Sequence, residues 1–230
     1  MSSTTRNALL KLALPLIKDH GFTRSALSLA VMYSPSGKHT APLNDTAVDA
    51  LFGEGDEARR TLMNAWLDDA RVSLRKSYSQ DSDTATTARN PSLGNVLKTR
   101  LSKNEGVLEH LPEAFALLAT PPTLSSLIFP LTLDPRPAIS HSMSVAAEAC
   151  KLSCDTSVGA TWYTRRATIG AIYTAAELHQ LYSPTTAHDF LDRLLEESQT
   201  LGMAVDETFI YAKYIVDAWK GIITSRGITP

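Results

Sequence analysis

Cysteine is scarce in this chain of 230 residues, which contains only Cys150 and Cys154. Two cysteines exclude a disulfide scaffold and indicate a reducing compartment. Basic side chains are not in excess either, because 22 lysines and arginines stand against 24 acidic residues, for a net charge of −2. The chain therefore lacks the overall positive field that would hold nucleic acid. No apolar run reaches the ~18 residues that a membrane span needs.

Catalytic and metal-binding motifs are also missing. The six histidines show no His-x-x-x-His spacing, and no Glu-x-x-His pair of the di-iron type is present. Gly53-Glu54-Gly55 lacks the strand and the further glycine of a dinucleotide loop, and there is no Gly-x-Ser-x-Gly elbow. Cys150 and Cys154 are four residues apart on a predicted helix, which favours small buried side chains over a metal pair. We therefore expect that this chain binds no metal and no cofactor and that it has no catalytic activity.

Strand signals are almost absent, whereas apolar residues recur at helical spacing along most of the chain. With 43% hydrophobic residues, the chain is an ordinary globular protein, and we predict an all-α fold. The first apolar stripe ends at His20-Gly21, and Thr23 reads as the N-cap of a short second helix. Asn44 or Asp45 can cap a third short helix, and a long helix opens at Asp56-Glu57.

A polar segment over residues 77–92 divides the chain. It is rich in Ser, Thr and Asp and lacks periodicity, which predicts a flexible loop. It separates an N-terminal module with its connecting helix, residues 1–76, from a helical body over 93–202. An amphipathic helix and tail follow over 203–230. From the loop onward, the pattern predicts helices at about 93–104, 111–119, 123–131, 138–153, 160–182, 185–200 and 203–225.

Residues 6–33 contain a helix, a Gly-aromatic-Thr turn and a short helix, and they resemble the start of the TetR-type regulator fold. The segment 34–52, where DNA recognition would follow, holds only Lys38 as a basic residue, against Asp45 and Asp49. DNA binding needs several phosphate contacts from clustered Lys or Arg. The pattern favours a helix-turn-helix-like module that keeps the shape without the activity. A ligand-responsive DNA-binding regulator is the alternative.

The stretch Trp162-Tyr163-Thr164-Arg165-Arg166 begins a helix with apolar residues on all sides, so we expect that helix to be central and buried. The helix dipole favours acidic side chains at a helix N-terminus, so two arginines there are unfavourable. A buried arginine also needs a hydrogen-bond acceptor. Spacing favours a pair between Arg166 and Asp155 or Glu177. Alternatively, the planar guanidinium of Arg166 faces a cavity and holds the anionic headgroup of a ligand.

The C-terminal stretch 205–224 gathers its polar residues in a stripe about 60° wide at helical spacing. The apolar region opposite is wider than a core-facing helix needs. Its aromatic residues suit a membrane interface. A dimer partner would cover the same surface, which would make the chain an interaction scaffold that binds no ligand. The residues that we expect to contact the membrane are Phe209, Val216, Trp219, Ile222 and Ile223.

Several segments together carry a family resemblance over about residues 6–225. They are Arg6-Asn7-Ala8-Leu9-Leu10, Gly21-Phe22-Thr23, Leu51-Phe52, Leu111-Pro112-Glu113-Ala114-Phe115-Ala116-Leu117-Leu118, Trp162-Tyr163-Thr164-Arg165-Arg166, Ala171-Ile172-Tyr173 and Glu177-Leu178. Together they resemble the ubiquinone-biosynthesis accessory family, coenzyme Q biosynthesis protein nine. The family usually reads Gly-Asp-x-Ser-x-Asp-Phe-Asn before the Trp-Tyr pair. Here residues 154–161 keep only Asp155 and Ser157 of that motif.

The resemblance implies a TetR-like helical bundle that binds lipid and does not regulate transcription. Such proteins bind isoprenoid quinone intermediates and phospholipid in an apolar cavity. They present the quinone to the di-iron demethoxyubiquinone hydroxylase. They lie on the matrix side of the mitochondrial inner membrane as peripheral proteins, held by the C-terminal amphipathic helix. From its first residues we expect no transit peptide in this chain. We expect a homodimer and no nucleic-acid partner.

The resemblance also implies roles for individual residues. Trp162 and Tyr163 fall on the surface that binds the hydroxylase. Arg166 falls where a lipid headgroup is contacted, and we expect Ile169 and Tyr173, which follow on the same helix, to contact the lipid as well.

Overall fold

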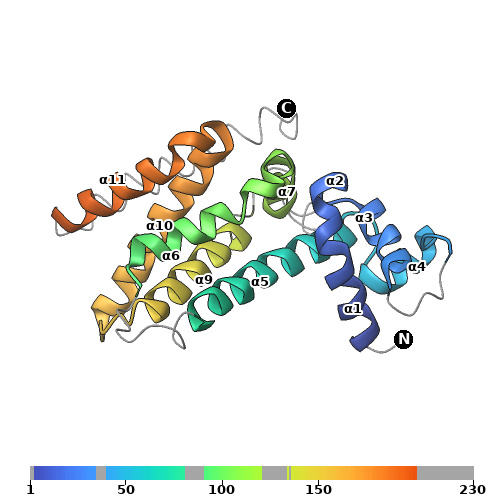
Figure 1. Ribbon diagram of the computed structural model, residues 1–230, viewed down its shortest axis with the longest axis horizontal. Coiled ribbons are helices and arrows are strands. Elements are labelled where there is room, and N and C mark those ends of the chain that lie inside the picture. The colour runs from blue at the N-terminus through green and yellow to red at the C-terminus, as the bar shows by residue number, and fades with distance from the viewer. Residues whose placement is uncertain (1–2, 35–39, 81–90, 121–133, 135, 201–230) are drawn as a thin grey trace. The chain divides into compact units, whose positions relative to one another are not determined.

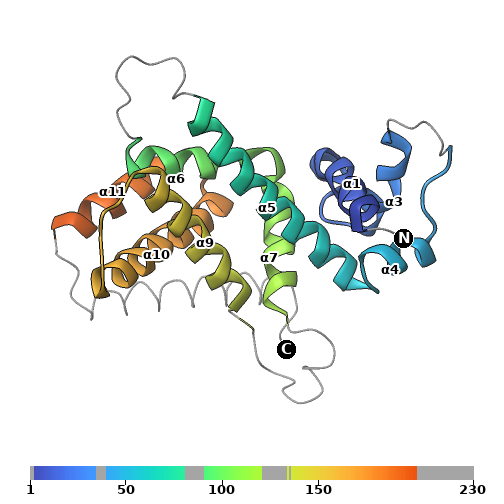
Figure 2. The same ribbon diagram turned by 90° about the horizontal axis from the view of Figure 1, so that it is seen from below.

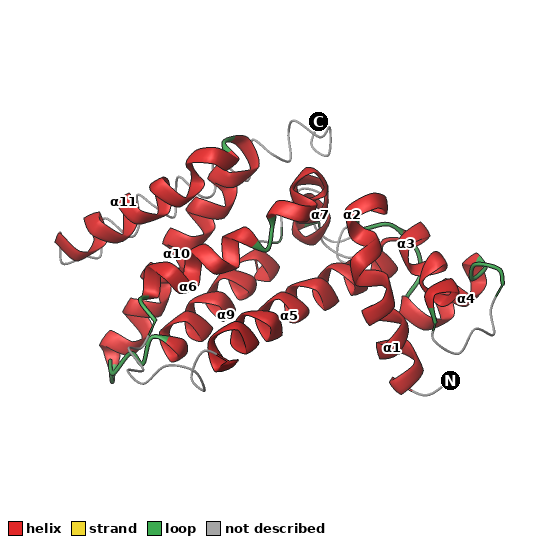
Figure 3. Cartoon of the chain, in the orientation of Figure 1, coloured by secondary structure: helices red, strands yellow, loops and turns green. Residues whose placement is uncertain are grey.

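The computed structural model describes residues 3–34, 40–80, 91–120, 134 and 136–200, and in these residues all regular secondary structure is helical (Figure 3). This confirms the predicted all-α class. The specifically TetR-like arrangement of the helices stays a prediction. None of the described helices is long and apolar enough to cross a membrane.

The chain forms two compact units that interleave along the sequence. Unit 1 comprises Met1–Asp69 and Gly106–Leu133, and unit 2 comprises Ala70–Glu105 and Asp134–Pro230. The long helix α5 (Asp56–Gln80) begins in unit 1 and ends in unit 2. The sequence pattern instead predicted domains that are each one continuous stretch of the chain.

Unit 1 is built from short helices around the start of α5. Besides α5, its elements are α1 (Ser3–Ala13), η1 (Leu14–Leu16), α2 (Ile17–His20), α3 (Arg24–Leu29), η2 (Ala30–Tyr33), α4 (Asp45–Phe52) and α7 (Leu111–Ala119), with η4 (Glu105–His110) leading into α7 (Figure 1). The predicted helix ends are confirmed. Gly21 closes α2 with a φ of 65°, the Thr23 side chain accepts a hydrogen bond from the Ala26 amide, and Asn44 does the same for Ala47.

Two arginines of α5 connect the two sequence segments of unit 1, because both contact α7 or the residue after it. Arg59 donates from Nε to the Phe22 carbonyl at 3.0 Å and pairs with Glu113 on α7. Arg60 donates to the Thr120 carbonyl at 2.6 Å, which satisfies a backbone acceptor at the end of α7. The α7 helix thus joins elements that lie far from it in the sequence.

Unit 2 is organised around α10 (Ala160–Tyr182), which packs against α9 (Arg136–Leu152) and α11 (Ala187–Thr200), with α6 (Leu93–Ser102) beside them (Figure 2). The short η5 (Pro184–Thr186) links α10 to α11. The middle of α10 is buried, as its all-round apolar sequence predicted. The end of α5 is joined to α9 by a bidentate ion pair between Arg75 and Glu148, with both N–O distances at 2.5 Å.

The predicted loop over 77–92 is wrong at its beginning, because α5 continues to Gln80. The ring of Tyr78 packs on the core of unit 2, and its hydroxyl hydrogen-bonds the Thr99 hydroxyl at 2.9 Å. These tertiary contacts extend the helix into a sequence with no helical periodicity. The next helix, α6, is capped by Ser92. The helices predicted at 123–131 and 203–225 lie outside the described residues.

A Schellman turn ends α9. The Asp155 amide donates to the Cys150 carbonyl at 2.9 Å, and the Cys154 amide donates to the Lys151 carbonyl at 3.2 Å. Cys154 has a φ of 53°, so a residue with a Cβ occupies the left-handed position that glycine normally takes in this motif. In the family motif that residues 154–161 resemble, glycine stands at the position that Cys154 occupies here.

A buried polar network surrounds Glu177 in the interior of unit 2. The Glu177 carboxylate accepts from the Tyr173 hydroxyl at 2.7 Å and from the Asn104 amide at 3.0 Å, and it lies 3.3 Å from Nε2 of His141. Asn104 also donates to Gln180 at 3.1 Å and accepts from Arg100 at 2.6 Å. The network therefore joins α9, α10 and the end of α6.

Burial alone would raise the pKa of Glu177, but the interaction with His141, the charge of Arg100 and the hydrogen bond from Tyr173 outweigh it and lower that pKa from 4.5 to about 2. The group is therefore ionised inside unit 2 at neutral pH. Burial also holds the pKa of Tyr173 well above its ordinary value, so Tyr173 donates as a neutral phenol.

Replacing Glu177 by Gln tests this network. We expect Glu177→Gln to lower the free energy of unfolding at pH 7 by about 3 kcal/mol, because the charge of Arg100 loses its buried counter-charge. Since the folded-state pKa lies below the unfolded-state value, the ionised group stabilises the fold above about pH 4.5, and this contribution decreases as the pH falls toward 2. Urea unfolding at pH 7, 5, 4 and 3 measures the difference in the free energy of unfolding between the variant and wild type. This difference should become smaller as the pH is lowered. A constant difference would contradict the assignment, and the exposed Glu105→Gln is the control.

Replacing Cys154 by Gly tests the turn after α9. We expect Cys154→Gly to raise the free energy of unfolding by about 0.5–1 kcal/mol, because glycine removes the Cβ strain of the left-handed position. Cys154→Ala keeps a Cβ and should leave the stability unchanged, which separates the backbone effect from loss of the thiol. Equal stability of the Gly and Ala variants in urea unfolding would show that the turn is unstrained.

Candidate functional site

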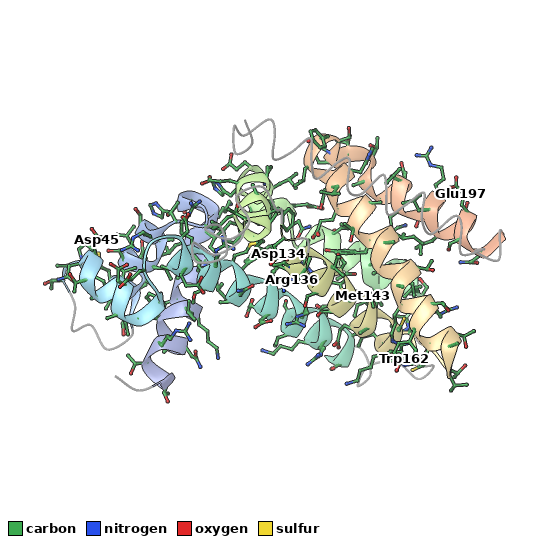
Figure 4. The ribbon with its side chains drawn as sticks, turned by 180° about the vertical axis from the view of Figure 1, so that it is seen from behind. Asp45, Asp134, Arg136, Met143, Trp162 and Glu197 are labelled. Carbon is green, nitrogen blue, oxygen red and sulfur yellow. The ribbon has the colours of Figure 1, made fainter. Side chains whose placement is uncertain are left out.

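The candidate site lies at the turn between α9 and α10 in unit 2. We call it the aromatic corner and define it as Asp155, Ser157, Trp162, Tyr163 and Arg166. Figure 4 shows Trp162 close to the start of α10, at one end of the helices of unit 2. The Schellman turn directs the chain away from α9, and Gly159, with a φ of 63°, precedes the first residue of α10.

Asp155 is the charged centre of the aromatic corner. Its carboxylate accepts a hydrogen bond from the Ser157 hydroxyl at 2.5 Å, and it lies 3.0 Å from Nε of Arg165 and 3.4 Å from Nη1 of Arg166. The Ser157 hydrogen bond and the two arginine charges lower the pKa of Asp155 from its ordinary value, against the opposing effect of burial. A buried, ionised carboxylate thus meets the two arginines that begin α10.

Arg166 pairs with Asp155, which confirms the first of the two acceptors that spacing allowed. Glu177, the second, belongs to the buried network. The same Nη1 donates to the Trp162 carbonyl at 3.2 Å, and the guanidinium carbon lies 3.9 Å from the centre of the Trp162 ring. Sequence analysis did not predict this stacking contact. The spacing of four residues between Trp162 and Arg166 on one helix face is the signal that identifies it.

Trp162 and Tyr163 form the outer surface of the aromatic corner. Their side chains are 39% and 69% exposed, and their rings meet edge to face with centroids 4.7 Å apart. Large aromatic side chains with this exposure are typical of protein-binding surfaces. Their binding to the hydroxylase stays a prediction.

Ile169 and Tyr173, two of the expected lipid contacts, lie in the apolar core of unit 2. Tyr173 is fully buried, and its hydroxyl is bound to Glu177. Their contact with a lipid stays a prediction, as does that of Arg166. The five expected membrane contacts, Phe209, Val216, Trp219, Ile222 and Ile223, lie outside the described residues.

Cys150 and Cys154 occupy different environments. Cys150 is buried, and burial raises the pKa of its thiol, whereas Cys154 is exposed. The expectation of two small buried side chains is therefore right for Cys150 and wrong for Cys154, because the helix ends between them. Over the part of the chain that the structure describes, no group of three or more His, Cys, Asp or Glu side chains could hold a metal ion.

Comparison with known proteins identifies a family model and curated proteins that this chain is similar to. Residues 136–202 match the COQ9 family model, and this stretch spans α9, α10 and α11. Among curated proteins, the ubiquinone biosynthesis protein coq9, mitochondrial, of Schizosaccharomyces pombe is 28% identical over 137 residues, or 58% of this chain and 50% of the relative. COQ9 of Rattus norvegicus is 22% identical over 97% of this chain and 68% of the relative.

COQ9 of Drosophila melanogaster is 26% identical over 88% of this chain and 58% of the relative. The chain thus spans about half to two thirds of the length of these relatives. The family-model match includes the helices that form the aromatic corner. Over α9, α10 and α11 this chain is therefore similar to the COQ9 family of ubiquinone biosynthesis proteins.

Proposed function

We propose that this chain is a lipid-binding accessory protein of ubiquinone biosynthesis. It binds isoprenoid quinone intermediates and phospholipid and presents the quinone to the di-iron demethoxyubiquinone hydroxylase. The observation that carries the proposal is the COQ9 match over residues 136–202, which span the helices around the aromatic corner. The relatives are named as mitochondrial ubiquinone biosynthesis proteins, so we also propose a mitochondrial location, on the matrix side of the inner membrane.

The physical chemistry of the substrate favours an accessory protein that performs no reaction of its own. Each CH₂ of a polyprenyl tail costs about 0.8 kcal/mol when it is exposed to water. A long tail therefore stays in the bilayer unless a protein offers it an apolar surface of similar area. Delivery of the reactive ring to an enzyme needs binding and orientation from the carrier, and the chemistry belongs to the hydroxylase.

The buried positions of Ile169 and Tyr173 set a condition on lipid binding at α10. Both side chains contact other core residues, so a lipid reaches them only if α10 moves relative to its neighbours. The C-terminal residues Trp219 and Ile223 and their apolar neighbours supply the proposed membrane contact. A membrane contact beside the lipid site would let the tail enter without crossing water.

Extraction of the purified chain tests lipid binding directly. We expect organic extraction and mass spectrometry to recover quinone intermediates or phospholipid at about one molecule per chain, because a hydrophobic ligand of this class dissociates slowly into water. The control is an unrelated helical protein purified in parallel from the same cells. An extract without lipid above that control would contradict the carrier function.

The exposed surface of the aromatic corner is the proposed contact for the hydroxylase. Trp162 and Tyr163 present an exposed aromatic area, and Arg165, whose side chain is 53% exposed, follows them on α10. Aromatic residues and arginine are the residue types that contribute most to binding energy at interfaces. This composition supports a protein partner at the start of α10.

Substitution of both aromatic residues tests this surface. We expect Trp162→Ala with Tyr163→Ala to weaken binding of the hydroxylase at least 10-fold, because each ring loses contact area in the complex. Tyr182→Ala is the matched control, since Tyr182 is 67% exposed at the opposite end of the same helix. Isothermal titration with the purified hydroxylase measures the affinities. Equal affinity of the double variant and wild type would refute the assigned surface.

A further inference from the structure

The guanidinium of Arg166 lies between the exposed Trp162 ring and the buried Asp155 carboxylate. Its carbon is 3.9 Å from the centre of the ring, and its Nη1 is 3.4 Å from the carboxylate. The Arg166 residue is only 8% exposed, whereas Trp162 is 39% exposed. A buried cation thus supports an aromatic ring that is accessible to a partner.

The hydrogen bonds of Arg166 are concentrated on one nitrogen. Nη1 contacts Asp155, the Ser157 hydroxyl and the Trp162 carbonyl, while the buried Nε has no hydrogen-bond partner. A buried donor without a partner is unfavourable, so hydrogen bonding alone does not account for the orientation of the guanidinium. Its orientation places one face against the indole, which is the geometry of a cation–π contact.

Arg165 supplies an internal comparison. It pairs with the same Asp155 carboxylate through Nε at 3.0 Å, and its side chain is 53% exposed. Both arginines therefore pair with the same carboxylate, and the guanidinium of Arg166 lies over the Trp162 ring. The ion pair and the stacking contact can thus be separated experimentally.

We propose that Arg166 is a positioning residue, which holds the Trp162 indole in one orientation so that the partner meets a preformed aromatic surface. The Asp155 turn fixes Arg166, Arg166 fixes Trp162, and the Trp162 ring packs edge to face on Tyr163. This inference rests on the proposed function of the aromatic corner. Order present before binding lowers the entropic cost of the complex.

Fluorine NMR of the full chain labelled with 5-fluorotryptophan tests the proposal. The Trp162 resonance is assigned with Trp162→Phe, and Arg166→Met is then compared with Arg165→Met. In Arg166→Met, we expect the Trp162 resonance to move toward that of a solvent-exposed indole and to narrow, because the ring loses its support. In Arg165→Met, the resonance should stay in place. Arg166→Met should also bind the hydroxylase about 2- to 10-fold more weakly than wild type.

Asp155→Asn provides a second variant that keeps the stacking pair and weakens its anchor. We expect a smaller displacement of the Trp162 resonance in the same direction, and circular dichroism verifies that the helices remain. An unchanged Trp162 resonance in both Arg166→Met and Asp155→Asn would overturn the positioning role. If the resonance moves as expected but Trp162→Ala binds the hydroxylase normally, the positioning of the ring stands and the proposed partner surface fails.

Discussion

The ionised carboxylate of Glu177 in the interior of unit 2 is the interaction on which that unit depends. Taking a carboxylate out of water is costly unless hydrogen bonds and opposite charges replace the water. Tyr173 from α10, His141 from α9 and Asn104 from the turn after α6 provide that replacement. Only one alignment of α9 along α10 satisfies the carboxylate, so the network fixes the register of these two helices.

Two further contacts follow from the same register. The hydroxyls of Ser142 and Thr174 lie 2.5 Å apart, and Gly170 leaves room for α9, since a Cβ there would lie 3.3 Å from Sδ of Met143. Apolar packing alone tolerates small shifts between helices, whereas a buried polar group with fixed partners does not. The position of Trp162 relative to the end of α9 is therefore set from inside unit 2.

The local features of this fold could be predicted from the sequence, because they depend on neighbouring residues. Thr23 and Asn44 cap helices as expected, and the all-round apolar pattern of α10 predicted its burial. The sequence also offered Asp155 as an acceptor for Arg166. It could not choose between Asp155 and Glu177, since that choice depends on His141 and Asn104, which come from other helices. The continuation of α5 through Tyr78 was missed for the same reason, because its stabilising partner is on α6.

The interleaving of the two units bears on how the chain folds during synthesis. Arg59 and Arg60 leave the ribosome early, but their acceptors Glu113 and Thr120 are about fifty to sixty residues further along the chain. Unit 1 is therefore incomplete until the first segment of unit 2, from Ala70 to Glu105, has already been made. A fragment that ends with α5 would lack α7. The guanidinium groups of Arg59 and Arg60 would then have neither Glu113 nor the Thr120 carbonyl as an acceptor. Neither unit is one continuous stretch of the sequence. Each unit must therefore fold although a segment of the other unit separates its two parts along the chain.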